Sequence, residues 1–198
     1  MPRIRGASIG EHHEMVWADL AEAMRQLLQE RDYESITMGH IAARSGLARN
    51  TLYNYGRDKH ALALALTERA GRPTVEQVAA IAARSADPAP SRLGEIVEAV
   101  LAAFTDPVVQ LMFRTSASPP SDQGPGSPFH EIVAEVENVV RDGISRGEFR
   151  DVGDVRLAVE LLSGVMRAGA ERLGRDPAAL KATVRAAREI VLASLTPA

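Results

Sequence analysis

The chain has 198 residues, of which 45% are apolar and 25% charged, so it is long enough for a real core and has the composition of a globular protein. It has no cysteine, which excludes disulfides and thiolate metal sites and fits a reducing compartment. The sequence has no apolar run long enough for a membrane span and no apolar signal core. We therefore expect a cytoplasmic protein without a membrane partner.

Charge is unevenly distributed along the chain. The net charge of −3 by itself argues against nucleic acid as a partner. However, four basic residues and one acidic residue lie between Ile36 and His60, whereas the residues after position 72 are acidic on balance. This pattern predicts a local positive footprint on a weakly acidic body.

A helix is predicted from about Glu11 to Arg31, after an N-terminal segment of about ten residues. Apolar residues recur at helical spacing on its expected inner face: Met15, Leu20, Met24, Leu27 and Leu28. The adjacent His12 and His13 point to different sides of such a helix, so they are a poor metal pair and are expected at the surface. We predict no metal site and no cofactor.

Residues 36–59 predict two short helices joined by a glycine turn. Thr37 is a plausible N-cap of the first helix, and Gly46 can take the left-handed conformation that ends it. The second helix is expected from Arg49 to about Tyr55, with Leu52 facing inward. This arrangement is typical of a helix-turn-helix, whose second helix enters the DNA major groove.

The outward residues of this segment suit DNA. Arg49 can form a bidentate hydrogen bond with guanine and Asn50 with adenine, and Thr51 offers a hydroxyl and a methyl group to a base edge. Tyr53, Tyr55 and Lys59 can bind phosphates. The predicted DNA-binding residues are Thr37, Arg49, Asn50, Thr51, Tyr53, Tyr55 and Lys59. From this chemistry alone, two surface helices with solvated charges remain an alternative.

From Ala18 to about Ala70 the chain resembles the DNA-binding domain of the TetR (tetracycline repressor) family of bacterial transcriptional regulators. The order and spacing of the matching residues are unbroken, and they are Met24 to Leu28, Tyr33, Ile36, Thr37, Ile41, Ala42, Gly46, Leu47, Thr51, Leu52, Tyr53, Tyr55, Lys59 and Leu62. The pattern departs at four positions: Asp32 for glycine, Gly39 for a polar residue, Ala48 for a capping residue and Gly56 for phenylalanine. The resemblance implies an operator-binding regulator.

A second helix-rich part follows the predicted DNA-binding part. His60 to about Arg84 is helical by pattern, and Pro73 predicts a kink or a break there. We place the domain boundary at this point, with a DNA-binding domain at 1–72 and an effector-binding and dimerisation domain at 73–198. Ser91 and Asp154 are each expected to cap a helix, and another helix is expected to start at Asp106. Further helices are expected from Phe129 to Arg146 and from Asp176 to about Leu195, and residues 118–128 predict a loop. No segment alternates with period two, so the predicted fold class is all-α.

The last two predicted helices are both amphipathic and rich in small residues. They could dock on a second copy across a two-fold axis, or they could fill the core of one protomer. The resemblance implies a four-helix homodimer interface. Its predicted residues are Leu157, Leu161, Val165, Leu180, Val184 and Val191.

A small-molecule effector is the third expected partner, after operator DNA and a second copy. Candidate pocket residues are Phe104, Met112, Phe113, Phe129 and Met166, with Arg114 and Arg167 as polar anchors. Taken singly, each apolar residue is explained better by core packing. Such walls favour a mostly apolar ligand, in some cases an anion, over a cationic drug.

No catalytic motif accompanies these features. The sequence lacks a phosphate-binding glycine loop, a His-Glu-x-x-His pair and a nucleophile elbow, so we predict no enzyme. The prediction is a homodimeric, two-domain transcriptional regulator, a repressor that an effector releases from its operator. The alternative is a helical interaction or scaffold protein of the same fold that lacks specific operator binding.

Overall fold

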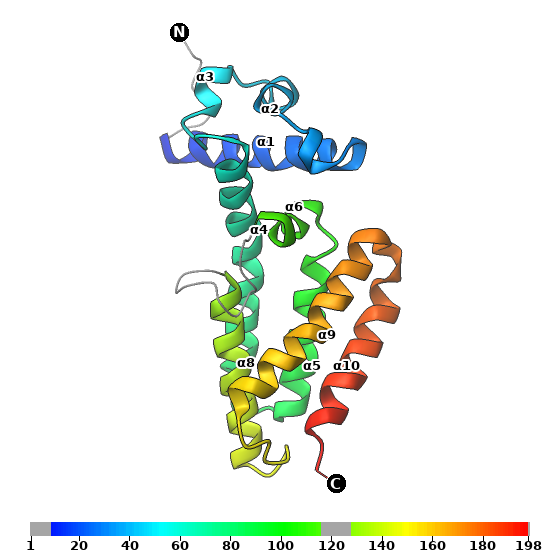
Figure 1. Cartoon of the computed structure of the whole chain (residues 1–198). Helices are drawn as coiled ribbons and strands as arrows, with labels where there is room; N and C mark the ends of the chain where they lie inside the picture. Colours follow the sequence, from blue (N-terminus) through cyan, green and yellow to red (C-terminus); the bar gives the residue numbers. More distant parts are fainter. Residues whose placement is uncertain (1–8, 116–127, 198) are drawn as a thin grey trace. The chain divides into compact units, whose positions relative to one another are not determined.

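The computed structural model describes residues 9–115 and 128–197, and every regular element in these ranges is a helix (Figure 1). The predicted all-α class is confirmed. In chain order the elements are α1 (Ile9–Glu30), η1 (Tyr33–Ser35), α2 (Met38–Ser45), α3 (Arg49–Leu52), α4 (Lys59–Ala82), α5 (Ala89–Ala103), α6 (Pro107–Gln110), α7 (Met112–Thr115), α8 (Pro128–Ser145), α9 (Val155–Arg175), η3 (Pro177–Ala179) and α10 (Leu180–Leu195).

The chain divides into two compact units. Among the described residues, the first comprises 9–70 and 106–115, and the second comprises 71–105 and 128–197. The expected break at Pro73 does not occur, because α4 continues through it as one helix. A proline inside a helix removes one backbone hydrogen bond but need not end the helix when the remaining bonds and packing persist. The division predicted from the sequence differs in a second respect, because it assigns residues 106–115 to the second domain and not to the first.

In the first unit, α1 provides one long face of the core. Val16, Leu20, Met24 and Leu27 are buried there and pack with residues of α2, α3 and α4. The expectation that Met15 lies inward is wrong, since its side chain is 44% exposed. The buried stripe follows a spacing of four, four and three residues from Val16, and Met15 falls about 100° away from it on the helix.

The short helix α6 belongs to the first unit because polar and apolar contacts tie it there. Asp106 caps α6 by accepting a hydrogen bond from the amide of Val108 at 2.9 Å, and the helix starts where the sequence predicts. The carbonyl of Val108 accepts a hydrogen bond from the Thr67 hydroxyl of α4 at 3.2 Å. Val108 and Leu111 are fully buried in the first unit's core.

In the second unit, α5 packs against α8, α9 and α10. Its predicted inner face is buried as expected, with Leu93, Ile96, Val97 and Leu101 in the core. The expected cap at Ser91 is wrong, because the helix already begins at Ala89 after Pro88. The amide of Ala89 instead donates to the Glu148 carboxylate at 2.6 Å, so a side chain distant in sequence performs the capping.

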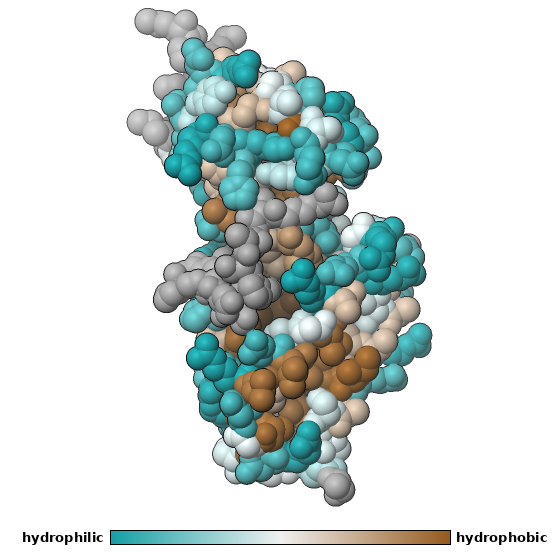
Figure 2. Space-filling view, viewed as in Figure 1, coloured by the Kyte–Doolittle hydropathy of each residue, from teal (hydrophilic) through white to brown (hydrophobic). Residues whose placement is uncertain are grey.

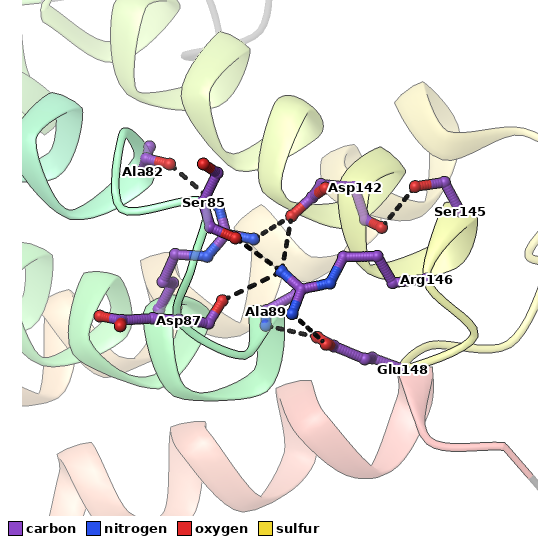
Figure 3. Close-up of polar contacts among 9 residues, drawn as sticks. Ala82, Ser85, Asp87, Ala89, Asp142, Ser145, Arg146 and Glu148 are labelled. Carbon is purple, nitrogen blue, oxygen red and sulfur yellow. Dashed lines mark hydrogen bonds and ion pairs between the residues drawn. The ribbon is translucent and has the colours of Figure 1, made fainter.

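Two arginines of the second unit hold the segment that follows α4 (Figure 3). Arg92 of α5 is only 2% exposed; it forms an ion pair with Asp142 of α8 and donates to the carbonyl of Ala82, the last residue of α4, at 2.9 Å. Arg146 donates to the carbonyls of Ser85 and Asp87 at 2.8 and 3.2 Å. The arginine side chains of α5 and α8 thus donate hydrogen bonds to backbone carbonyls at the end of α4 and just after it, which the helix itself leaves without a partner.

Candidate nucleic-acid interface

The first helix of the pair, α2, has a reciprocal cap. The Thr37 side chain accepts from the amide of His40 at 3.2 Å, and His40 Nδ1 accepts from the amide of Thr37 at 3.3 Å. Gly46 ends α2 with φ = 70°, a left-handed conformation that glycine adopts without a Cβ clash. The predicted cap, helix and turn are confirmed.

The second helix, α3, is shorter than the sequence predicts. It covers Arg49–Leu52 and continues as a tight turn, in which the amides of Asn54 and Tyr55 donate to the carbonyls of Thr51 and Leu52 at 3.1 and 3.0 Å. Ala48 occupies the N-cap without a side-chain hydrogen bond. Leu52 is fully buried in the first unit's core, and this burial fixes which side of α3 faces outward.

The outward side of α3 carries polar side chains without internal partners. Arg49, Asn50 and Tyr53 are exposed, and Thr51 is half-buried. Within the described ranges, the side chains of Arg49, Asn50 and Tyr53 form no hydrogen bond and no ion pair. A guanidinium, an amide and a phenol are therefore presented together from one short helix and its following turn, with their donors available to an external ligand.

Lys59, the first residue of α4, has a different environment from the one expected. Its Nζ donates to the carbonyl of Tyr33 at 2.7 Å and to that of Glu34 at 3.2 Å. The same ammonium lies 4.2 Å from the centre of the Tyr33 ring. The side chain expected at a phosphate is thus engaged with the η1 turn of its own unit.

Tyr55 also packs inward. Its ring centre lies 5.0 Å from those of Trp17 and His13 in α1, edge-on to the indole and tilted on the imidazole. Burial raises the pKa of the Tyr55 phenol. The guanidinium of Arg69 lies over the indole of Trp17, 5.0 Å from the centre of the ring. The Tyr55 ring therefore links the end of the helix pair to α1, and Trp17 of α1 in turn contacts α4 through Arg69.

Gly56, which stands in place of the family's phenylalanine, allows a close backbone approach. A Cβ at this position would lie 2.7 Å from the Cα, Cβ and N atoms of Leu62. Because these are backbone atoms and a fully buried side chain, they have little freedom to move. The turn after α3 is held directly against α4, where a larger residue has no room.

The predicted effector residues are divided between the two units. Phe104 and Phe129 form a ring pair in the second unit, with centres 6.1 Å apart. Met112 and Phe113, however, belong to the first unit, and Met112 is buried there. The predicted anchor Arg167 is paired with Glu171 at 3.1 Å, and the side chain of Arg114 lies outside the described residues.

The predicted dimer residues divide into exposed and buried sets. Leu157 and Leu161 on α9 are 52% and 68% exposed, but Val191 on α10 is only 2% exposed and belongs to the protomer's own core. Val165, Leu180 and Val184 are half-buried. Val191 is therefore excluded from the outer face, because α10 turns this stripe toward α5 and α9.

An apolar outer face nevertheless covers α9 and α10, where Figure 2 shows brown surface gathered in the second unit. On α10 the exposed apolar residue is Ile190, at 55% exposure, which the sequence analysis missed. The exposed apolar and small residues of this face recur every three or four positions: Leu157, Leu161, Gly164, Ala168, Ala182, Ala186, Ile190 and Ala193. We call this set the α9–α10 face.

A shallow cavity of about 250 Å³ lies beside this face, between the start of α9 and the end of α10. Its lining is mostly apolar and includes Leu157, Leu161, Leu162 and Leu195, with Arg150 at its edge. Arg150 Nε donates to the carbonyl of Ser194 at 2.8 Å, which ties the segment before α9 to the end of α10.

A capped helix, a left-handed glycine turn and a second helix with unengaged outward donors form a helix-turn-helix, a motif typical of DNA-binding proteins. Residues 20–66 match the family described as "Bacterial regulatory proteins, tetR family". This segment is therefore similar to the DNA-binding domain of TetR-family transcriptional regulators. No curated protein sequence matches it significantly.

Solved structures share this fold at low sequence identity. FadR from Bacillus subtilis, in complex with stearoyl-CoA, has 16% identity and a TM-score of 0.74, over 89% of this chain and 97% of FadR. The MbdR regulator from Azoarcus sp. CIB has 20% identity and a TM-score of 0.71, over 89% and 97%. The SmeT–triclosan complex has 18% identity and a TM-score of 0.68, over 92% of each chain.

None of the helices in ranges 9–115 and 128–197 is long and apolar enough to cross a membrane. In the same ranges, no group of three or more histidine, aspartate or glutamate side chains could hold a metal ion.

Proposed function

We propose that this protein is a TetR-type transcriptional regulator and that it reads its operator through Arg49 and Asn50, which contact base edges from the N-terminal turn of α3. The observation that carries the proposal is the division of α3 into a fully buried Leu52 and outward donors without internal partners. Arginine pairs with the O6 and N7 atoms of guanine and asparagine with N6 and N7 of adenine, so the two side chains specify different bases.

Phosphate contacts orient the helix pair on the duplex. Tyr53 is exposed at the end of α3 and donates its phenolic proton to a phosphate. Thr37 is exposed and caps α2 at the positive end of the helix dipole, where a phosphate is favoured. Thr51 of α3 is half-buried and offers its methyl group to a thymine or its hydroxyl to the backbone.

The regulator acts as a homodimer through the α9–α10 face. Three large apolar side chains on this face, Leu157, Leu161 and Ile190, are each more than half exposed in one protomer. The small residues between them permit close helix approach, as in a four-helix interface. Two recognition helices then enter successive major grooves about 34–36 Å apart, and the operator is a palindrome.

The regulator represses transcription and is released by a mostly apolar effector bound in the second unit. Supporting observations are the apolar side chains of that unit, including the Phe104–Phe129 pair, and the ligands of two structures with the same fold, stearoyl-CoA in FadR and triclosan in SmeT. Because α4 begins in the DNA-binding unit and ends among Arg92 and Asp142 of the second, it connects the two in sequence. We assign no enzymatic activity, and we place the protein in the cytoplasm with its DNA.

An electrophoretic mobility shift with the promoter next to the protein's own gene tests this function. Binding should be specific, should weaken as salt rises, and should shift the DNA as a dimer. Arg49→Ala should abolish the preference for the promoter over random DNA. The matched control is Arg175→Ala, which removes an exposed arginine of the second unit and should leave binding unchanged. Equal affinity for promoter and random DNA would contradict the proposal and favour the scaffold alternative.

A further inference from the structure

We propose that the Lys59 side chain positions the helix-turn-helix from inside the first unit and does not bind a DNA phosphate. The inference rests on DNA binding by α3, and it changes the role that the sequence pattern assigns to this lysine.

The contacts of Lys59 use most of the binding capacity of its ammonium group. Two N–H donors are directed at the carbonyls of Tyr33 and Glu34, at 2.7 and 3.2 Å. The charge also lies 4.2 Å from the centre of the Tyr33 ring, within the range of a cation–π contact. Tyr33 itself is only 6% exposed, so this ring is a fixed part of the core and not a mobile surface group.

These contacts join the two ends of the helix-turn-helix. Tyr33 and Glu34 form the turn just before Thr37, where the chain enters α2. Lys59 begins α4, where the chain leaves the turn that follows α3. One side chain thus links the entry and the exit of the segment that carries Arg49 and Asn50, and it fixes the distance between them.

Other contacts in this region point to the same role. Tyr55 packs on Trp17 of α1, and Gly56 lies against the backbone of Leu62 in α4. Asp58 accepts from the amide of Ala61 at 2.8 Å and so caps α4. The α3 helix has only four residues and no side-chain cap, so its orientation depends on such external contacts. While these two charge-assisted hydrogen bonds persist, only the third N–H donor of the Lys59 ammonium is left for any other ligand.

The test is the variant Lys59→Met in the full-length protein, because methionine keeps an apolar stem over Tyr33 but cannot donate a hydrogen bond. Dissociation constants for promoter and for random DNA would be measured over a range of salt concentrations. A positioning role predicts a loss of about tenfold or more on the promoter, little loss on random DNA and an unchanged salt slope. Loss of one direct phosphate contact would instead weaken both DNAs alike and flatten the slope by about 0.9. The latter result would overturn the proposal.

The matched control is Arg57→Met, which removes a cation two residues away whose side chain is 89% exposed. It should leave the promoter preference intact. Hydrogen exchange provides a readout without DNA: Lys59→Met should speed exchange of the amides of residues 49–55, whereas Arg57→Met should not. Unchanged exchange in Lys59→Met would also overturn the proposal. If wild-type protein failed to prefer its promoter, the proposed function would fail, and the exchange result would still test the role of Lys59.

A variant that keeps the lysine covers the case in which Lys59→Met does not fold. Tyr33→Leu removes the ring under the ammonium and leaves the charge. If Lys59 acts by position, Tyr33→Leu should also reduce promoter preference without changing the salt slope. An unchanged promoter preference in folded Tyr33→Leu would contradict the proposal.

Discussion

Arg25 of α1 and Asp106, which are 81 positions apart in the chain, form a two-pronged ion pair. Arg25 Nε lies 2.9 Å from Oδ2 of Asp106, and its Nη2 lies 2.9 Å from the same carboxylate oxygen. The hydrogen-bonded carboxylate of Asp106 raises the pKa of the Arg25 guanidinium. Asp106 also caps α6, and this double role explains why residues 106–115 belong to the DNA-binding unit.

Asp106→Ala should destabilise the first unit by about 1–2 kcal/mol, since it removes a helix cap of about 1 kcal/mol and a partly exposed ion pair of at most about 1 kcal/mol. Asp106→Asn is the matched control, because the amide oxygen can still accept from the amide of Val108. It should cost roughly half as much. Chemical denaturation measures both, and equal losses in the two variants would show that the cap contributes nothing.

Gly56→Ala should destabilise the first unit by about 1–3 kcal/mol, because the added methyl group would overlap the backbone of Leu62 at 2.7 Å. Gly39→Ala is the comparison: its nearest neighbour would be the Thr37 hydroxyl oxygen at an ordinary 3.6 Å, and alanine favours a helix. This second change should leave stability unchanged or raise it by up to about 1 kcal/mol. Thermal unfolding distinguishes the two, and a stable Gly56→Ala protein would contradict the close approach.

Local sequence features predicted the helix-turn-helix well. Thr37, Gly46 and Leu52 act through neighbours within a few positions, and a cap, a left-handed turn and an inward leucine each have a short-range physical cause. The resemblance to a known family added the operator as partner. The helix start at Ala89 was missed because its capping partner, Glu148, lies 59 positions away.

Long-range packing explains the other differences. Both Val191 and Ile190 fit an amphipathic α10, and a rotation of about 100° decides which of them is buried. Lys59 was expected at a phosphate because its position matched the pattern, but no local signal shows that the carbonyls of Tyr33 and Glu34 lie within its reach. The effector residues were chosen by residue type, and type alone could not show that Met112 packs in the other unit.

Asn50→Ala should relax operator specificity at one base pair per half-site, at a cost of about 1–3 kcal/mol on the matched sequence. Tyr53→Phe should weaken binding to all sequences alike, since only a phosphate contact is lost. A panel of single-base operator variants, measured by fluorescence anisotropy at fixed salt, separates these outcomes. If Asn50→Ala kept the wild-type ranking of the panel, the assigned role of Asn50 would be wrong.

Tyr33→Phe should leave stability at pH 7 unchanged within about 1 kcal/mol or raise it, because the buried phenolic oxygen has no hydrogen-bond partner among the described residues. At alkaline pH the two proteins should diverge. Burial, followed by the nearby carboxylates of Glu34 and Asp58, raises the pKa of Tyr33 above its ordinary value of 10.0. The folded state therefore favours the neutral phenol, and this contribution is full below about pH 10 and is lost as pH rises through the folded-state pKa.

Phenylalanine cannot ionise, so above about pH 10 the Tyr33→Phe variant should lose less stability than the wild type. Chemical denaturation at pH 7 and at several values above pH 9 measures the difference in unfolding free energy between the two proteins. Lysines also titrate in this range, but both proteins contain the same lysines. Tyr53→Phe, which removes an exposed phenol of the same unit, is measured alongside as the control. Parallel profiles for wild type and Tyr33→Phe would contradict the argument.

Ile190→Arg should dissociate the proposed dimer and abolish operator binding, because it would bury an unpaired charge at the centre of an apolar interface. Leu161→Arg should act in the same way from α9, and since both side chains are more than half exposed in one protomer, neither change should unfold it. Met15→Arg, at an exposed apolar position of the first unit, is the control and should leave the dimer intact. Sedimentation velocity measures the association state, and circular dichroism verifies folding. Folded, dimeric Ile190→Arg and Leu161→Arg proteins would show that the second copy docks on a different surface.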